Sequence, residues 1–286
     1  MPTVLVTGAA GQVGREVMAL DWPGWRLVGV DRDQLDITDA NAVAAFTQRE
    51  RPDLILNCAA HTAVDRAESE AELSDAINRA GPAHLAATGV PMVHISTDYV
   101  FDGRPGRPWR EGDATGPLGV YGRTKLAGEQ AVAATAGRWA VLRTAWVFGR
   151  HGANFVKTML RLAAERDELR VVGDQQGGPT PADAIAAACQ TIGLALLDRA
   201  NVNGIYHFAG APPTTWAGFA QAILAASAAH GRRVVPVRAI ATADYPTPAK
   251  RPANSVLDCT LIHTTFGIAQ PDWRAALVRM MPELVS

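Results

Sequence analysis

The sequence is poor in the residues that build disulfide frameworks and metal clusters. Its 286 residues include three cysteines, Cys58, Cys189 and Cys259, which lie too far apart in the sequence to form a metal-ligand motif. Such sparse cysteine usage is typical of proteins in a reducing compartment. We therefore expect a cytoplasmic protein, and the sequence itself predicts no metal site.

An excess of charge of one sign is also lacking. The 27 basic and 28 acidic residues give a net charge of −1, and no run of Lys or Arg occurs. Proteins that bind nucleic acid or anionic lipid usually carry a basic patch or stripe. We therefore expect neither a nucleic acid nor a membrane as partner.

Long hydrophobic runs are missing as well. No stretch approaches the ~18 consecutive apolar residues of a membrane-spanning helix. Residues 1–14 lack the basic and apolar regions of a signal peptide. The composition, 48% hydrophobic and 19% charged, is ordinary for a globular protein.

The first half of the sequence does contain a regular alternation of strand-like and helix-like segments. Short β-branched or apolar runs predict strands over 3–7, 25–31, 52–60, 91–101 and 139–149. Helical spacing of apolar residues predicts helices over 11–21, 39–50 with Asp39 as the cap, 72–89 with an interruption at Gly81-Pro82, and 118–137. This alternation predicts an α/β fold with a Rossmann-like, doubly wound parallel sheet in residues 1–150.

The second half alternates less regularly. We expect helices over 154–168, 182–198 and 215–231, another helix near the C-terminus, and a strand over 204–208. The segment 244–255 carries three prolines and is expected to be an ordered loop. We expect a smaller α/β substrate lobe in residues 151–286, with a boundary spread over 150–180 and room for the chain to cross between the lobes.

A glycine-rich turn follows the first predicted strand. Gly8, Gly11 and Gly14 open a predicted helix, which is the context of a dinucleotide-binding fingerprint. Glycines let the backbone approach a pyrophosphate at the helix N-terminus. Asp31 ends the second strand, where a carboxylate can bind the adenosine ribose, although it could equally be a turn residue. Because Arg32 follows and suits a 2′-phosphate, the sequence leaves NADPH and NADH both open.

A phenol and an ammonium are spaced four residues apart at Tyr121 and Lys125, on one face of a predicted helix. The alternative is a surface helix with an incidental Tyr and Lys. Thr97 adds a hydroxyl at the end of the fourth strand, where ligands bind in open α/β sheets. The glycine turn, this hydroxyl and the Y-x-x-x-K pair together resemble the short-chain dehydrogenase/reductase family. A cation beside a tyrosine lowers the pKa of its phenol, so Tyr121 would be the proton donor and Thr97 would bind the substrate oxygen.

Strings along the whole chain resemble dTDP-4-dehydrorhamnose reductases, which are extended members of that family. They are NCAAHTAVDRAESE, HISTDYVFDG, YGRTKLAGE, LRTAWVFG, NFVKTMLRLA, DQQGGPT, YPTPAKRPANS and PDWRAAL. The resemblance implies reduction of the C4 ketone of dTDP-4-dehydro-β-L-rhamnose to dTDP-L-rhamnose with NADPH or NADH. It also leaves room for Mg²⁺ and for a homodimer, although the sequence has no carboxylate cluster that demands a metal.

The resemblance also implies the site residues. Those implied for the cofactor are Gly8, Gly11, Gln12, Val13, Asp31, Asp36, Ile37, Ala60, His61, Thr62, Tyr121 and Lys125. Those implied for the substrate are Thr97, Asp98, Tyr121, Trp146, Asn154 and Arg251. His61 could instead be an ordinary loop histidine, Trp146 a core aromatic residue, and Arg251 a brace for its proline-rich loop.

Two other functions stay open on the sequence alone. One keeps the chemistry and changes the substrate to another dTDP-4-keto-6-deoxy sugar. The other is a non-catalytic regulatory subunit of the same fold, like the β subunit of methionine adenosyltransferase. The intact set of Thr97, Tyr121 and Lys125 favours an enzyme, because a subunit that only binds does not need a tuned phenol.

Overall fold

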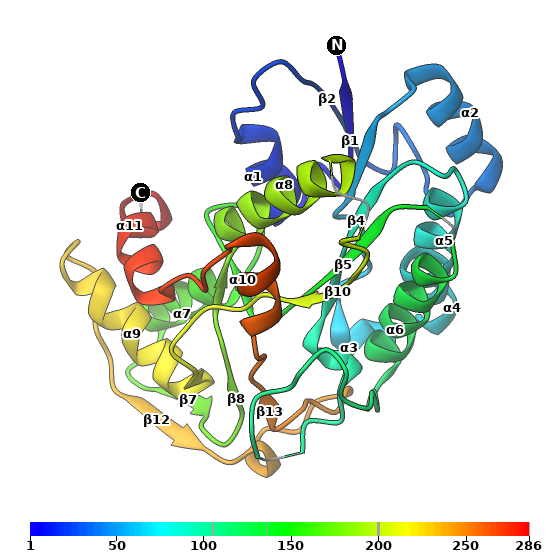
Figure 1. The fold of residues 1–286 in the computed structure, drawn as a ribbon. Coiled ribbons are helices and arrows are strands. Elements are labelled where there is room, and N and C mark those ends of the chain that lie inside the picture. The colour runs from blue at the N-terminus through cyan, green and yellow to red at the C-terminus, as the bar shows by residue number, and fades with distance from the viewer. Residues whose placement is uncertain (105, 136, 199–200, 286) are drawn as a thin grey trace.

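The computed structural model describes residues 1–104, 106–135, 137–198 and 201–285 (Figure 1). At its centre lies a parallel six-stranded sheet with the order β10-β5-β4-β3-β1-β2. Its strands are β1 (Thr3–Thr7), β2 (Arg26–Val30), β3 (Leu54–Asn57), β4 (Met92–Thr97), β5 (Trp139–Thr144) and β10 (Gly204–His207). The strand order reverses between β1 and β3, as in doubly wound sheets. The predicted α/β, Rossmann-like class is confirmed.

The strand β1 shows why the sheet is central. All five of its residues are buried. Val4 and Val6 belong to one hydrophobic cluster and Leu5 to another, because successive side chains point to opposite faces. A strand covered on both faces reads as a continuous apolar run, which is the pattern of a parallel sheet between two helical layers.

Helices cover both faces of this sheet (Figure 1). One layer contains α1 (Gln12–Ala19) and α8 (Ala182–Asp198), and the other contains α2 (Ala40–Glu50), α5 (Gly81–Ala86) and α6 (Val120–Ala133). The predicted cap of α2 is confirmed, since the Asp39 carboxylate accepts hydrogen bonds from the backbone of Asn41 and Ala42.

The helix predicted over 72–89 is not broken at Gly81-Pro82. It follows α3 (Val64–Ala67) and runs through α4 (Ala71–Asp75), a π-helical segment η1 (Ala76–Ala80) and α5. The wider π turn places Gly81 N–H on the carbonyl of Ala76, and Pro82 then lies in the first turn of α5, where its missing N–H costs little.

Three of the predicted strands, over 52–60, 91–101 and 139–149, are markedly shorter than expected, and all three end at the carboxyl edge of the sheet. The first of them, β3, ends at Asn57. Instead of continuing to residue 101, β4 gives way after Thr97 to a 3-10 turn, η2 (Asp98–Val100). Between β5 and the short β6 (Val147–Phe148) the chain breaks at Trp146, whose φ is 47°. These breaks turn polar and aromatic side chains outward at the edge where ligands bind.

The second half of the chain has its own hydrophobic core. It is built mainly from α7 (Phe155–Glu165), α9 (Trp216–Ala228) and α11 (Trp273–Val285), with the paired strands β7 (Leu169–Val172) and β12 (Val237–Ile240). Around it lie β8 (Gln176–Gly177), β9 (Thr180–Pro181), β11 (Thr214–Thr215), η3 (Thr242–Asp244), β13 (Asn254–Ser255) and α10 (Thr260–Phe266). None of these elements was predicted. The strands and η3 among them are only two or three residues long and carry too little periodicity.

The chain returns to the central sheet after entering the second half. The helix α8 packs on α1, and β10 pairs with β5 at the sheet edge. The division into residues 1–150 and 151–286 stays a prediction. In the part of the chain described here, no helix is long and apolar enough to cross a membrane.

Candidate active site

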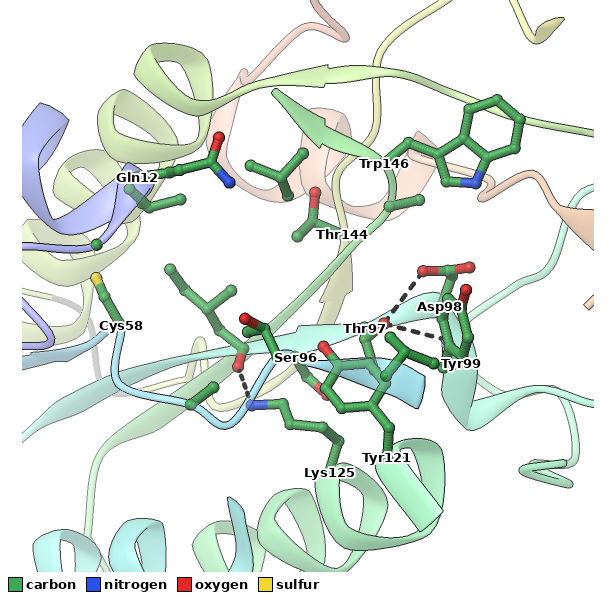
Figure 2. Close-up of a pocket in the computed structure, with 18 of the residues that line it drawn as sticks. Gln12, Cys58, Ser96, Thr97, Asp98, Tyr99, Tyr121, Lys125, Thr144 and Trp146 are labelled. Atoms are coloured by element: carbon green, nitrogen blue, oxygen red, sulfur yellow. Dashed lines mark hydrogen bonds between the residues drawn. The ribbon is translucent and has the colours of Figure 1, made fainter. Parts of the chain in front are cut away.

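A cavity of about 470 Å³ lies over the carboxyl ends of β1, β3, β4 and β5. Figure 2 shows its labelled residues, with Tyr121 and Lys125 on one wall and Gln12, Thr144 and Trp146 on the opposite wall. Each strand ends where the chain must turn into a helix or loop. The cavity is therefore lined by residues that follow the strands, as expected at the switch point of a doubly wound sheet.

The glycine turn forms the end of this cavity that has the features of a dinucleotide-binding site. Gly8 has a φ of +69°, and a Cβ on it would lie 2.7 Å from the backbone N of Ala59. A Cβ on Gly14 would collide with the carbonyl of Gly8. Gly11 caps α1 without a side-chain hydrogen bond, so the first N–H groups of α1 stay open to an anionic ligand. The turn thus fits the pyrophosphate of a dinucleotide, with Gln12 and Val13 lining the cavity beside it.

A second cavity of about 320 Å³ continues from the first and shares Gly11, Cys58 and Ala60 with it. Among the residues lining it are Gly8, Asp31, Arg32, Asp36 and Ile37. This is the end where an adenosine would lie. The structure thus brings most of the expected cofactor residues together.

Two carboxylates of this second cavity have defined partners. Both Asp31 carboxylate oxygens accept from the backbone N of Ala10, at 3.1 and 2.9 Å. Hydrogen bonds from Thr38, together with the nearby Arg32, hold the pKa of Asp36 below its ordinary value. An acceptor at Asp31 and a cation at Arg32 face the same cavity, as the sequence suggested.

His61 lies beside the first cavity without lining it, whereas its neighbours Ala60 and Thr62 do line it. Its ring Nε2 lies 3.0 Å from the Glu70 carboxylate, and its backbone N donates to Asn78. The side chain therefore ties this loop to the start of α4, while its ring Nδ1 has no hydrogen-bond partner among the described residues.

Thr97, Tyr121 and Lys125, the three residues predicted to be catalytic, meet in the first cavity (Figure 2). The helix α6 can approach the turn at Tyr99 closely because Gly122 has no Cβ. A Cβ at this position would collide with the carbonyl of Tyr99. Its first turn is held by Glu68, whose carboxylate accepts from the backbone N of Val120 at 2.8 Å. All three reactive side chains are at most 9% exposed, so water is largely excluded around them.

The electrostatics of Tyr121 differ from the sequence expectation. Burial raises the pKa of Tyr121 to about 12, the hydrogen bond with Thr97 opposes this rise, and the charge of Asp98 adds to it. Lys125 does not produce the expected lowering. Its Nζ donates to the carbonyl of Ile95 at 2.6 Å and lies 3.3 Å from His94 Nε2.

Asp98 is 3% exposed, and the two oxygens of its buried carboxyl group differ in their hydrogen-bond partners. Its Oδ1 accepts from the Thr97 hydroxyl at 3.1 Å, whereas its Oδ2 has no hydrogen-bond partner among the described residues. Burial raises the pKa of Asp98 to about 6, against hydrogen bonds from Ser255 and Thr97. Thr144 Oγ1 in the same cavity is also buried without a partner. Both atoms could accept hydrogen bonds from a polyhydroxylated ligand.

An aromatic wall closes the far side of the cavity. Trp146 and Trp216 stack with ring centroids 3.6 Å apart and an interplanar angle of 12°. Phe155 lies against Trp216 at 4.7 Å. Trp146 therefore lines the site, although it also packs on both hydrophobic cores. Nothing in the sequence pattern pointed to Trp216, because it comes from a helix 70 residues further along the chain.

A third cavity of about 400 Å³ lies behind this wall and shares Phe155 and Trp216 with the first. Three arginines line it, Arg166, Arg170 and Arg251, together with polar residues that include Gln175, Thr242 and Tyr245. Of these residues, only Arg251 was expected in the site from the sequence. An arginine-lined cavity beside an aromatic wall suits a nucleoside diphosphate.

Arg251 and Asn154 have structural partners as well. Arg251 Nη2 lies 2.7 Å from the Asp65 carboxylate, which joins the loop 244–255 to α3. Asn154 caps α7 by accepting from Lys157 N, and its Nδ2 donates to the carbonyl of Gly149. Asn154 does not line the cavities, so its position favours a role in orienting α7. No group of three His, Cys, Asp or Glu side chains that could hold a metal ion occurs in the described residues, and nothing here supports Mg²⁺.

Comparison with known proteins agrees with this geometry. The family model "RmlD substrate binding domain" matches residues 2–286. The dTDP-4-dehydrorhamnose reductase of Sinorhizobium fredii is 44% identical over 96% of this chain and 95% of its own length. The enzyme of the same name from Escherichia coli K12 is 40% identical over 98% and 97%.

Solved structures give the same result. A dTDP-4-dehydrorhamnose reductase from Clostridium acetobutylicum superposes with a TM-score of 0.92 at 37% identity, covering 99% of this chain and 100% of that one. The Bacillus anthracis enzyme, solved in complex with NADP, gives 0.90 at 34% identity, with coverage of 99% and 100%. A UDP-glucose 4-epimerase from Brucella ovis, 21% identical, shares the fold, with a TM-score of 0.82 over 99% and 98%.

Proposed function

This chain belongs to the RmlD family of dTDP-4-dehydrorhamnose reductases, and from that premise we propose that it reduces the C4 ketone of dTDP-4-dehydro-β-L-rhamnose to dTDP-L-rhamnose with NADPH or NADH. It is an oxidoreductase of this family. The observation that carries the proposal is the convergence of Tyr121, Thr97 and the glycine turn in one cavity, which shares its aromatic wall with an arginine-lined one.

The cofactor would bind along the first two cavities. Gly8, Gly11, Gln12 and Val13 would receive its pyrophosphate, and the carboxylate of Asp31 would receive the adenosine ribose. When bound, the nicotinamide supplies the hydride that reaches C4. The expected contacts of Asp36, Ile37, Ala60, His61 and Thr62 belong to this proposal.

Tyr121 would donate its phenolic proton to the substrate oxygen as negative charge develops there. One hydride at C4 and one proton at the oxygen convert the ketone to the alcohol and leave a tyrosinate, which water reprotonates. Thr97 would donate a hydrogen bond to the same oxygen. Because the phenol is 9% exposed, this transfer takes place where solvent cannot compete for the proton.

The sugar and the nucleotide would lie on either side of the aromatic wall. Asp98 Oδ2, which lacks a partner, would accept from a sugar hydroxyl, and Trp146 would cover the apolar face of the sugar ring. Beyond the wall, Arg166, Arg170 and Arg251 would bind the diphosphate and its nucleoside. Asn154 would hold Gln12 in place, since its Nδ2 donates to Gln12 Oε1 at 3.2 Å.

The test is a turnover assay with purified protein, NADPH or NADH, and enzymatically prepared dTDP-4-dehydrorhamnose. Nicotinamide absorbance reports oxidation, and chromatography with NMR identifies the sugar product. We expect cofactor oxidation with dTDP-L-rhamnose as the product.

Two other outcomes would contradict this proposal in different ways. Oxidation that yields a C4 epimer, or occurs only with another dTDP-4-keto-6-deoxy sugar, would keep the chemistry and change the substrate. Cofactor binding without oxidation of any such sugar would favour a regulatory subunit.

A further inference from the structure

The third cavity contains a side-chain acceptor that the proposed function does not yet use. Among the described residues that line this cavity of about 400 Å³, Gln175 alone carries an amide or carboxylate oxygen. It is 4% exposed and lies between β7 and β8. The arginines that line the same cavity can only donate hydrogen bonds. A ligand that has a proton to donate would therefore look to Gln175.

A hydrogen-bond relay through Thr242 orients the Gln175 amide. The Thr242 hydroxyl lies 2.6 Å from Asp174 Oδ1, and the backbone N of Thr242 donates to the same carboxylate at 3.0 and 2.9 Å. These hydrogen bonds hold the pKa of Asp174 below its ordinary value, so the group is ionised and can only accept. The Thr242 hydroxyl therefore donates its one proton to Asp174.

The relay leaves the amide oxygen of Gln175 available. Since Thr242 has no proton left, the amide atom that lies 3.0 Å from its Oγ1 must be the donor, Nε2. The Gln175 Oε1 accepts no hydrogen bond from the described residues. Buried polar atoms normally have a partner, so a nearly buried oxygen without one in a cavity wall indicates a ligand that donates to it.

A pyrimidine imide fits this acceptor better than a sugar hydroxyl does. A hydroxyl both donates and accepts, so an arginine can satisfy it, whereas an imide N–H can only donate and needs an acceptor when it is buried. The two carbonyls that flank this N–H suit donors such as Arg166 and Arg170. Phe155 and Tyr245 add aromatic surface for a planar base.

We propose that Gln175 is a specificity-determining residue whose Oε1 accepts from the N3–H of the thymine base, and that Asp174 and Thr242 are positioning residues that orient its amide. The inference deepens the proposed function and rests on it, since it takes a dTDP-linked sugar as the ligand. Uracil carries the same N3–H, whereas N3 of cytosine has no proton. The cavity should therefore bind dTDP and UDP more tightly than CDP.

The first measurement is isothermal calorimetry on the unsubstituted full-length protein with dTDP, N3-methyl-dTDP and 2′,3′-dideoxythymidine diphosphate. We expect N3-methylation to raise the Kd by roughly tenfold, because it removes the proton and leaves Oε1 unpaired. Equal Kd values for dTDP and N3-methyl-dTDP, or no binding of dTDP at all, would overturn the inference.

The second measurement repeats these titrations with Gln175→Leu, which removes the acceptor and keeps a side chain of similar size. We expect the Kd for dTDP to rise by roughly tenfold and the penalty of N3-methylation to fall below about twofold. A methylation penalty that persists in this variant would reflect steric exclusion alone and would contradict the hydrogen bond. If the dideoxy penalty disappears instead, Oε1 binds the 3′-hydroxyl and the assignment to the base is wrong.

Two further variants separate the base contact from a structural role. Gln176→Leu changes an exposed neighbour that lines none of the three cavities, and it should leave all of these Kd values unchanged. Thr242→Val removes the hydroxyl from the relay and keeps the shape of the side chain. We expect it to lower the ratio of the N3-methyl-dTDP and dTDP Kd values, which a merely structural role would not change. An unchanged ratio would remove the positioning role of Thr242.

Should Gln175→Leu not fold, the unsubstituted protein decides through UDP and CDP, because CDP lacks the N3 proton without added bulk. We expect CDP to bind roughly tenfold more weakly, and equal Kd values would overturn the inference. None of these readouts needs turnover. Turnover of dTDP-4-dehydrorhamnose without any effect of the N3 proton would therefore sink this inference alone, whereas the expected Kd pattern without turnover would sink only the proposed function.

Discussion

At the residue scale, Tyr121 and Lys125 share one helix face but differ in their surroundings. The phenol lies in the cavity beside Thr97, whereas the amine is held beneath it by the carbonyl of Ile95. Spacing on a helix places two side chains on one face, but the neighbouring strand decides which atoms they bind. These different surroundings agree with the proposed role of Tyr121 as the proton donor and of Lys125 as a residue that supports it.

Tyr121→Phe removes the proposed proton donor and keeps the ring. We expect kcat to fall by roughly 10²–10⁴-fold, the usual contribution of a positioned acid, with cofactor affinity unchanged. Nicotinamide absorbance measures the first quantity and isothermal calorimetry the second. The matched control is Tyr99→Phe, which removes a phenol whose ring centroid lies 5.5 Å from that of Tyr121 and should cost far less. Near-normal turnover in Tyr121→Phe would remove the donor role.

Asp31→Asn removes the charge proposed to bind the adenosine ribose. One amide oxygen can still accept from Ala10 N, so the glycine turn should persist. We expect the Kd for NADH to rise more than the Kd for NADPH, because the carboxylate repels a 2′-phosphate and accepts from a 2′-hydroxyl. Fluorescence titration of both cofactors checks this. An equal loss for both would show that Asp31 does not discriminate between them.

At the element scale, the site depends on how strands end. The 3-10 turn after β4 presents Asp98, and the break after β5 presents Trp146 in a left-handed backbone conformation. A tryptophan with φ of 47° is held there by packing, at a cost on the order of 1–3 kcal/mol. The short strand β8 contributes to this packing through Gly177.

Gly177→Ala should disturb the aromatic wall. A Cβ at Gly177 would lie 2.5 Å from Cε2 of the Trp146 indole, so the ring must shift. We expect a loss of about 1–3 kcal/mol in unfolding free energy, typical of overpacking, and a higher KM for the sugar nucleotide with cofactor affinity unchanged. Urea denaturation and steady-state kinetics measure these.

Gly112→Ala serves as the control for this substitution, because its added Cβ meets nothing within 4 Å and the position is exposed. An unchanged KM in Gly177→Ala would mean that Trp146 does not contact the substrate.

At the scale of the whole molecule, the first cavity is lined by both halves of the chain and adjoins the other two, of which the second is lined only by the first half and the third only by the second half. Phe155 and Trp216 join the first cavity to the third, and the Asp65–Arg251 ion pair joins α3 to the loop 244–255. Each half thus contributes one end of the proposed substrate site. Buried charge in the first cavity also affects global stability.

Asp98→Asn should change how stability depends on pH. The folded-state pKa of Asp98, about 6, exceeds the ordinary pKa of 3.8 for an aspartate, so the native state binds more protons between these pH values. The unfolding free energy therefore falls as pH rises through this window, by about 3 kcal/mol at 1.36 kcal/mol per pKa unit. Asn cannot ionise, so the variant does not lose this unfolding free energy as the pH rises.

Urea denaturation at pH 4 and pH 7 measures the effect of Asp98→Asn. We expect the variant to gain about 1–3 kcal/mol relative to the unsubstituted protein on going from pH 4 to pH 7. The difference at pH 4 is the internal control, because it contains the effect of the substitution without ionisation. A pH-independent difference would show that Asp98 does not titrate as its burial implies.

The sequence by itself determined the fold class, and it predicted the cofactor end and the Tyr121–Lys125 pair. Glycines at 8, 11 and 14, the alternation of apolar segments, and Tyr121 four residues before Lys125 are local patterns, and local patterns follow from backbone geometry. The π turn before Gly81 and the early end of β4 escaped prediction, because element boundaries depend on what the segment packs against.

The tertiary structure alone decided the contacts between residues far apart in the sequence. It stacked Trp216 on Trp146, gathered Arg166 and Arg170 beside Arg251, and placed His94 against Lys125. It also raised the pKa of Tyr121 where the sequence suggested a lowering, since burial outweighs the other effects there. Such contacts and burial arise when helices pack on the sheet, and no periodicity within one segment encodes them.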